Sequence, residues 1–311
     1  GHITGLAGGV FLNNATATFT ANMAANYNWL ASAGTDCAFI NKGVFTKTGT
    51  STNAIQWPFQ HSATLNVAQG ALSLAGGGTY AAPLTVANAA SIAFTGGLHL
   101  VESQIQTTGS GVMQVAADTV VLTRTGVLTG SLAVIGGTFQ VYGQLHLQAS
   151  SFTGGLMWVG DGGLYDNTGA TVCQGALLSF ASTSQLVNLG AYLQVITGTI
   201  QLRNNVLPQP VVPFNVTGGV LDLGNTDFTI PLLTQTGGTV TLTSTLTVTD
   251  TYRMSGGSMV SPVNGSIVAQ SQFIADTPAD KAITGVFLDV VKSGSWVAGN
   301  IRGSTFAVIR V

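Results

Sequence analysis

The chain has 311 residues, of which 6% are charged and 41 are glycine, and its net charge is −2. So few cations cannot neutralise a run of phosphates, which argues against nucleic-acid binding. Thr, Ser, Asn, Gln and Gly must cover the surface, and such a surface favours strands and tight turns over long solvated helices. The sequence contains no 18-residue apolar stretch free of polar residues, so it predicts no transmembrane helix. The sequence starts without Met or a signal-peptide pattern, so we expect a mature protein or a segment of a larger one.

Residues 1–54 are predicted to form an N-terminal cap and the first, irregular coils of a repeating structure. Coils are expected through 28–35 and 39–49, and a short helical turn within 20–29. Residues 1–20 are expected to cover the end of the first coil, because an uncovered end exposes apolar core and unpaired strand edges.

Residues 55–274 are predicted to form a regular β-solenoid. Gly-Gly pairs begin at Gly218, Gly237 and Gly256, 19 residues apart, and alternating apolar and polar residues follow, as in Leu221-Asp222-Leu223. Alternation predicts a strand with one buried face, and a strand-plus-turn unit repeated at this interval predicts stacked coils. We therefore expect an all-β, right-handed parallel β-helix with about 20 residues per coil.

The stack is expected to be interrupted between Arg203 and Pro210. Pro208 and Pro210 cannot serve in an interior ladder, so this segment is predicted to protrude. Residues 275–311 are predicted to form a C-terminal cap or junction segment, because they hold an unusual share of the charged residues. These are Asp276, Asp280, Lys281, Asp289, Lys292, Arg302 and Arg310.

Two segments, 41–49 and 63–79, carry a resemblance to known proteins. The first reads Asn-Lys-Gly-Val-Phe-Thr-Lys-Thr-Gly, and the second ends in Gly-Ala-Leu-Ser-Leu-Ala-Gly-Gly-Gly-Thr. The pattern resembles the repeats of long β-solenoid surface proteins, such as autotransporter-passenger-like and filamentous adhesin-like proteins. The resemblance implies a secreted or surface-displayed fibrous protein and supplies no catalytic residue. His61-Ser62, where an Asn-x-Gly turn is usual, departs from the pattern, as do the two prolines.

The two cysteines, Cys37 and Cys173, are about seven coils apart in this fold. Stacked strands are spaced by roughly 4.8 Å, which separates the two residues by ~30 Å. That distance excludes a disulfide, so we expect two buried free thiols.

Two pairs of carboxylates are the candidates for sugar cleavage or a weak calcium site. Asp161 and Asp166 are five residues apart, and Asp222 and Asp227 repeat that spacing. Sugar cleavage needs carboxylates that converge on one face. The alternative is that these residues cap turns of their own backbone. We favour the alternative and assign no catalytic, cofactor-binding or metal-binding residue.

Histidines, aromatic residues and threonines have plain structural interpretations as well as functional ones. The histidines (His2, His61, His99 and His146) lack metal-ligand spacing, and the two that stand between leucines, His99 and His146, are expected to face outward. Four aromatic residues are candidates for sugar stacking, although we favour core or corner positions as their explanation: Tyr142, Trp158, Tyr165 and Trp296. A threonine row from Thr241 to Thr249 is expected along one strand face, where strand propensity explains it better than ice binding.

Three N-glycosylation patterns begin at Asn14, Asn215 and Asn264, and they matter only if the source glycosylates its proteins.

Taken together, the features of the sequence predict a non-catalytic structural or adhesive component of an extracellular or surface-displayed fibre without a cofactor. The expected partners are further copies of the chain and a glycan or cell-surface ligand. The alternative is a carbohydrate-binding or carbohydrate-degrading β-helix, which needs one of the Asp pairs exposed in a groove beside aromatic side chains.

Overall fold

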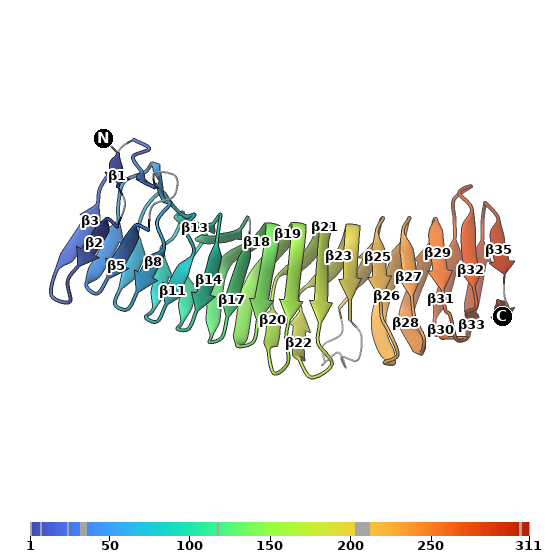
Figure 1. Cartoon of the computed structure of the whole chain (residues 1–311). Coiled ribbons are helices and arrows are strands. Elements are labelled where there is room, and N and C mark those ends of the chain that lie inside the picture. Colours follow the sequence, from blue (N-terminus) through green and yellow to red (C-terminus); the bar gives the residue numbers. More distant parts are fainter. Residues whose placement is uncertain are drawn as a thin grey trace. The chain divides into compact units, whose positions relative to one another are not determined.

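The computed structural model of the chain describes residues 2–6, 8–23, 25–31, 36–116, 118–202, 212–304 and 307–310. Its strands are parallel and stack in about 12 coils, about 21 residues apart, so the predicted all-β solenoid is confirmed (Figure 1). The described residues contain no helix, and hence none that could cross a membrane. The chain divides into two compact units, residues 1–158 with 162–164 and residues 159–161 with 165–311.

The strands of the first unit run from blue to green in Figure 1. They are β1 (Ile3–Gly5), β2 (Val10–Asn13), β3 (Thr18–Ala21), β4 (Trp29–Ala31), β5 (Ala38–Asn41), β6 (Val44–Lys47), β7 (Thr52–Ile55), β8 (Phe59–His61), β9 (Leu65–Val67), β10 (Ala71–Leu74), β11 (Gly78–Tyr80), β12 (Leu84–Val86), β13 (Ser91–Phe94), β14 (Leu98–Val101), β15 (Ile105–Thr107), β16 (Val112–Val115), β17 (Thr119–Leu122), β18 (Gly126–Val141) and β19 (Gln144–Val159).

From β4 to β15, three short strands make one coil, because each strand pairs in parallel with the third strand before it and the third strand after it. β10 pairs with β7 and β13, and β11 pairs with β8 and β14. The longer β18 then pairs with β15, β16 and β17 in turn. The pairing already begins with β1, which lies beside β4. The inter-coil ladder satisfies the backbone N–H and C=O groups without charged side chains, so a chain this poor in charge can still fold.

The strands of the second unit show the same parallel stacking. They are β20 (Leu164–Asn167), β21 (Ala170–Phe180), β22 (Gln185–Leu189), β23 (Tyr192–Gln201), β24 (Phe214–Val216), β25 (Val220–Asp222), β26 (Phe228–Gln235), β27 (Thr239–Thr241), β28 (Thr245–Met254), β29 (Gly257–Val260), β30 (Ser266–Ala269), β31 (Gln272–Ala275), β32 (Lys281–Thr284), β33 (Phe287–Val290), β34 (Ser293–Trp296), β35 (Ile301–Ser304) and β36 (Val308–Arg310). The segment predicted to protrude, Arg203 to Pro210, lies outside the described residues.

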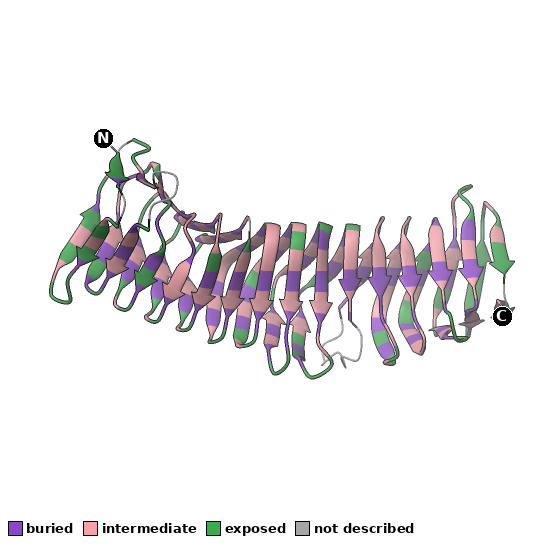
Figure 2. Cartoon of the chain, in the orientation of Figure 1, coloured by how far each residue is buried: buried purple, intermediate pink, exposed green. Residues whose placement is uncertain are grey.

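Inward-facing side chains of successive coils stack into columns, and burial alternates along the strands as predicted (Figure 2). One column of the second unit is entirely aliphatic apart from a methionine. Its members are Leu178, Ile200, Leu221, Val240, Met259 and Ile283. Each member loses almost all contact with water, and this burial is the main stabilising term of the coil stack.

Phe39 lies at the centre of an aromatic cluster in the first coils and is fully buried. Its ring centroid lies 4.6 Å from that of Phe11 and 5.0 Å from that of Phe59. Trp29 and Phe45 lie 5.6 Å away on other strands of the coil. Rings at these separations gain packing energy beyond the area that they bury.

Replacing Phe39 with Leu is expected to lower the free energy of unfolding by about 1.5 kcal/mol, because the smaller side chain loses ring contacts and leaves a small void. Urea unfolding followed by tryptophan fluorescence measures the change, since Trp29 lies in the cluster. Tyr142→Leu, at a site 39% exposed, is the control and should change stability by less than about 0.5 kcal/mol. Equal destabilisation by the two variants would contradict the assigned role of the cluster.

Three expectations about individual elements are wrong. The described residues between 20 and 29 contain no helical turn, and residue 24 is outside the description. The threonine row does not share one strand face, because Thr241 ends β27 and a turn precedes Thr245 at the start of β28. His99 points inward and is fully buried, while Leu98 beside it is 62% exposed.

The inward orientation of His99 follows from its register. His99 lies beside Gly78 in the parallel ladder, and the inward position at Gly78 has no side chain to fill the core. Nδ1 of His99 lies 2.9 Å from the hydroxyl of Tyr80, and Nε2 lies 2.7 Å from the carbonyl oxygen of Gly96. Both ring nitrogens are thus satisfied inside the core, which removes the cost of burying them. His146 is half-buried between two buried leucines, as predicted.

Candidate functional site

The first carboxylate pair lies at the turn before β20 and within that strand. Asp161 is exposed in the turn before β20, and its Oδ1 accepts a hydrogen bond from the hydroxyl of Thr183. Asp166 is half-buried within β20. Tyr165, a candidate for sugar stacking, is instead fully buried, with its hydroxyl 3.0 Å from Oγ1 of Thr171. The burial of Tyr165 confirms the core interpretation of this residue, because strand alternation turns its side chain inward.

The second carboxylate pair bonds to the backbone, and Asp222 caps its own turn as the turn-capping alternative predicts. Asp222 is buried, and its Oδ1 accepts a hydrogen bond from the N–H group of Gly224 at 3.1 Å. Asp227 is exposed, and its Oδ1 accepts a hydrogen bond from the N–H group of Thr245, one coil further on, at 2.8 Å. Each carboxylate satisfies a turn or a strand start.

The thiols and the potential metal ligands are dispersed. Cys37 and Cys173 are buried and no disulfide joins them, as predicted. Burial raises the pKa of the Cys173 thiol, which disfavours the reactive thiolate. Among the described residues, no three His, Cys, Asp or Glu side chains lie together as a metal site would require.

Tyr142 and Trp158 form an aromatic pair on the outside of the first unit. Their ring centroids are 5.9 Å apart with an interplanar angle of 74°. Tyr142 is 39% exposed and Trp158 is half-buried. Trp296 is 60% exposed in the last described coil, where its Nε1 donates a hydrogen bond to the carbonyl oxygen of Gly299. These three aromatic candidates are accessible, in contrast to Tyr165.

A polar ladder, which the sequence interpretation missed, runs inside the first coils. The side-chain amide of Asn13 donates to Oδ1 of Asn41 at 2.7 Å. The amide nitrogen of Asn41 lies 3.0 Å from Nδ1 of His61, whose Nε2 lies 3.4 Å from the carbonyl oxygen of Pro83. A signal was present, because the motif Phe-x-Asn occurs at 11–13 and 39–41 and Phe-x-His follows at 59–61.

His61 is held neutral by this environment. Desolvation by burial lowers the pKa of the imidazole to about 4, and hydrogen bonds to the backbone at Pro83 and Ala82 oppose the shift. A neutral ring accepts at Nδ1 and donates at Nε2, which matches the two contacts above. The ring therefore anchors the corner of its coil.

Two lysines, Lys47 and Lys281, are also buried, which the sequence did not predict. Nζ of Lys47 donates to the carbonyl oxygens of Gly49 and Gln69. Nζ of Lys281 donates to the carbonyl oxygens of Thr277 and Ala279, each at 2.8 Å. Burial lowers the pKa of Lys47. Both ammonium groups tie a corner of the backbone together inside the solenoid.

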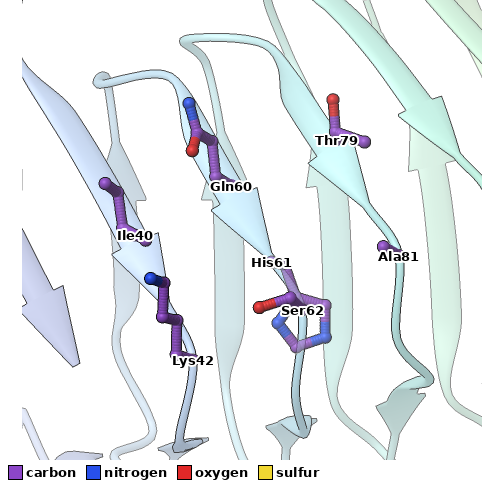
Figure 3. A pocket seen from close by; sticks show the side chains of 7 residues that line it. All are labelled: Ile40, Lys42, Gln60, His61, Ser62, Thr79 and Ala81. Atoms are coloured by element: carbon purple, nitrogen blue, oxygen red, sulfur yellow. The ribbon is translucent and has the colours of Figure 1, made fainter. Parts of the chain in front are cut away.

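A polar hollow of about 300 Å³ lies on the outside of β5, β8 and β11 (Figure 3). Its lining consists of Ile40, Lys42, Gln60, His61, Ser62, Thr79 and Ala81. We call it the Lys42 hollow. Parallel pairing puts Ile40, Gln60 and Thr79 in one row across three successive coils. Lys42, Ser62 and Ala81 follow these strands at the corner of the coil. The hollow is therefore lined on one side by the row of three strand residues and on the other by these corner residues.

An apolar hollow of about 320 Å³ lies in the last described coils of the second unit. Its lining includes Phe273, Val290, Trp296, Ile301 and Ile309. It exists because Gly294 occupies the inward position next to Phe273 in the ladder and has no side chain to cover that ring.

Comparison with known proteins leaves the fold as the only classification of this chain. No family model matches it, and neither a curated protein nor a solved structure is detectably similar.

Proposed function

We propose that this chain is a non-catalytic structural and adhesive element of a fibre displayed outside the cell. The observation that carries the proposal is a parallel ladder within each unit combined with carboxylates that serve turns and backbone. Such a ladder resists unfolding along the stack because each coil is held by its two neighbours. The nearly uncharged surface rich in Thr and Asn supports close packing of copies, since little charge repulsion opposes association.

End-to-end association of copies fits the two terminal coils that are described. β1, β2 and β3 pair on one edge only, and Phe11 and Phe19 are half-buried there. At the other end, β34, β35 and β36 likewise pair on one edge only, beside the apolar hollow. No Asp, Glu, Lys or Arg occurs before Asp36, so the first coil lacks the charges that usually keep an open strand edge from pairing.

The test is sedimentation velocity and electron microscopy of the purified chain over a range of concentrations. Wild-type protein is expected to form rods that lengthen with concentration. Ile309→Lys, which places a charge in the apolar hollow, is expected to abolish this lengthening, because a charge cannot be buried there without a partner. Tyr142→Lys is the control at an exposed aromatic residue away from both terminal coils and should assemble normally. Protein that stays monomeric at all concentrations, and binds no cell surface, would overturn the proposal.

A further inference from the structure

The Lys42 hollow contains three polar side chains without a partner in the fold. Lys42, Gln60 and Thr79 come from three successive coils, and their side chains make no hydrogen bond or ion pair with another described residue. By contrast, the outward side chains of Ser73 and Thr95 in neighbouring coils bond to each other at 2.8 Å. The groups in the hollow are therefore available to an external ligand.

We propose that the Lys42 hollow binds a carboxylate-bearing sugar residue of the uronic acid class. The proposal rests on the adhesive function above and names the ligand chemistry of that function. It requires one anionic group beside Lys42, hydroxyl groups beside Gln60 and Thr79, and a ring small enough for the hollow.

The charge at Lys42 stands out in this part of the chain. Residues 1–101 contain three charged side chains, Asp36, Lys42 and Lys47. Lys47 is buried against carbonyl oxygens, which leaves Lys42 as the exposed cation of these coils. Figure 3 shows the Lys42 side chain extending back along β5 toward Ile40. An ammonium group at this place favours an anion, and a carboxylate gives it a charge-assisted hydrogen bond.

The remaining lining suits a sugar better than a simple ion. Gln60 offers an amide that donates and accepts, and Thr79 and Ser62 offer hydroxyl groups with the same versatility. Sugar hydroxyls also donate and accept, so such groups can match them in pairs. Ile40 and Ala81 supply apolar surface for the C–H groups of a sugar ring. A hollow of about 300 Å³ stands at the lower end of the size range of ligand sites.

The wall of the hollow is held rigidly. Gln60 lies between Ile40 and Thr79 in the backbone ladder, and three strands span about 10 Å at their usual spacing. Beneath the wall, His61 is fixed by Asn41 and Pro83. A preorganised site loses less entropy when a ligand binds. With one cation, each site binds weakly, and repeated display along a fibre raises the avidity.

The test is titration calorimetry of the purified chain with glucuronate, with glucose as the neutral analogue and acetate as the bare carboxylate. Glucuronate is expected to bind, and both glucose and acetate to bind at least about tenfold more weakly, because glucose lacks the carboxylate and acetate lacks the hydroxyl groups. Lys42→Gln is expected to weaken glucuronate binding about tenfold. Gln60→Ala, which keeps the charge, is also expected to weaken it. Lys292→Gln removes an exposed lysine far along the sequence and is the matched control.

The outcomes separate this inference from the proposed function. Equal affinity for acetate and glucuronate would reduce the site to an ion contact and overturn the inference. Absence of glucuronate binding, or equal loss in the Lys42 and Lys292 variants, would overturn it too. Circular dichroism checks that each variant is folded. Lys42→Gln is expected to form rods like the wild type. If the wild-type chain binds glucuronate but forms no rods, only the fibre proposal is overturned.

Discussion

Gly130→Ala is expected to lower the free energy of unfolding by about 3 kcal/mol, the upper end of the range for overpacking. A Cβ atom at this residue would overlap the carbonyl oxygen and carbon of Gly111 in the preceding coil. Backbone atoms cannot change rotamer to relieve the overlap as a side chain can, so the coils that contain Gly111 and Gly130 must move apart. The adjacent ladder hydrogen bond, from the N–H group of Ser131 to the carbonyl oxygen of Gly111 at 3.1 Å, is expected to weaken.

Chemical unfolding and amide hydrogen exchange measure the effect of Gly130→Ala. Exchange is expected to accelerate first near Gly111 and Ser131, because coils of a solenoid contact only their neighbours. Gly162→Ala is the control. Gly162 has a φ of +73°, and a Cβ atom added there would meet no other atom within 4 Å, so this variant tests backbone strain alone, at about 1 kcal/mol. Equal losses in the two variants would refute close coil contact as the cause.

Acid is expected to destabilise the chain well above the pH at which carboxylates titrate. Burial lowers the pKa of His61 and of His99 to about 4 in the folded chain, against ~6.5 when unfolded. Because the folded-state pKa is depressed, the unfolded chain binds protons first as pH falls. The stability is fully present above pH ~6.5 and is lost between there and pH ~4, by about 2 kcal/mol per histidine at pH 5.

The measurement is the urea midpoint between pH 7.5 and 4.5. The double variant His61→Asn/His99→Gln is expected to have a midpoint that changes little over this range, even if its stability at pH 7.5 is lower. His146→Gln, at an outward-facing histidine, is expected to retain the wild-type slope. Asp276, whose pKa is lowered by hydrogen bonds from Ser255 and Arg253, adds acid sensitivity only at lower pH. A flat wild-type midpoint would show that the two imidazoles are not held neutral in the folded chain.

The candidate site was only partly visible in the sequence. The prediction that Asp222 caps a turn of its own backbone is confirmed by the hydrogen bond that it accepts from Gly224, because a turn within one coil is a local property. The Lys42 hollow was not predicted, because its row of side chains comes from three coils whose register depends on the whole stack. The orientation of His99 was predicted wrongly for a related reason: alternation says that successive residues face opposite ways, and only the neighbouring coils decide which way is inward.

Of the three glycosylation patterns, tertiary structure distinguishes one from the others. Asn14 and Asn264 are exposed, and Asn264 has a φ of +62°. Asn215 is half-buried in β24, with its Oδ1 fully buried. The tripeptide pattern alone treats all three alike, because it contains no information on burial.

The sequence by itself determined the solenoid. Gly-Gly pairs at a constant interval, strand alternation and a scarcity of charge are all local or periodic properties, and a parallel stack of coils is the arrangement that buries every apolar face they create. Tertiary structure alone decided which polar groups lie inside, where Asn13, Asn41 and His61 join, and which remain free outside, as Lys42 and Gln60 do. The physical reason is register, because a shift of one residue between neighbouring coils exchanges the inner and outer faces of a strand.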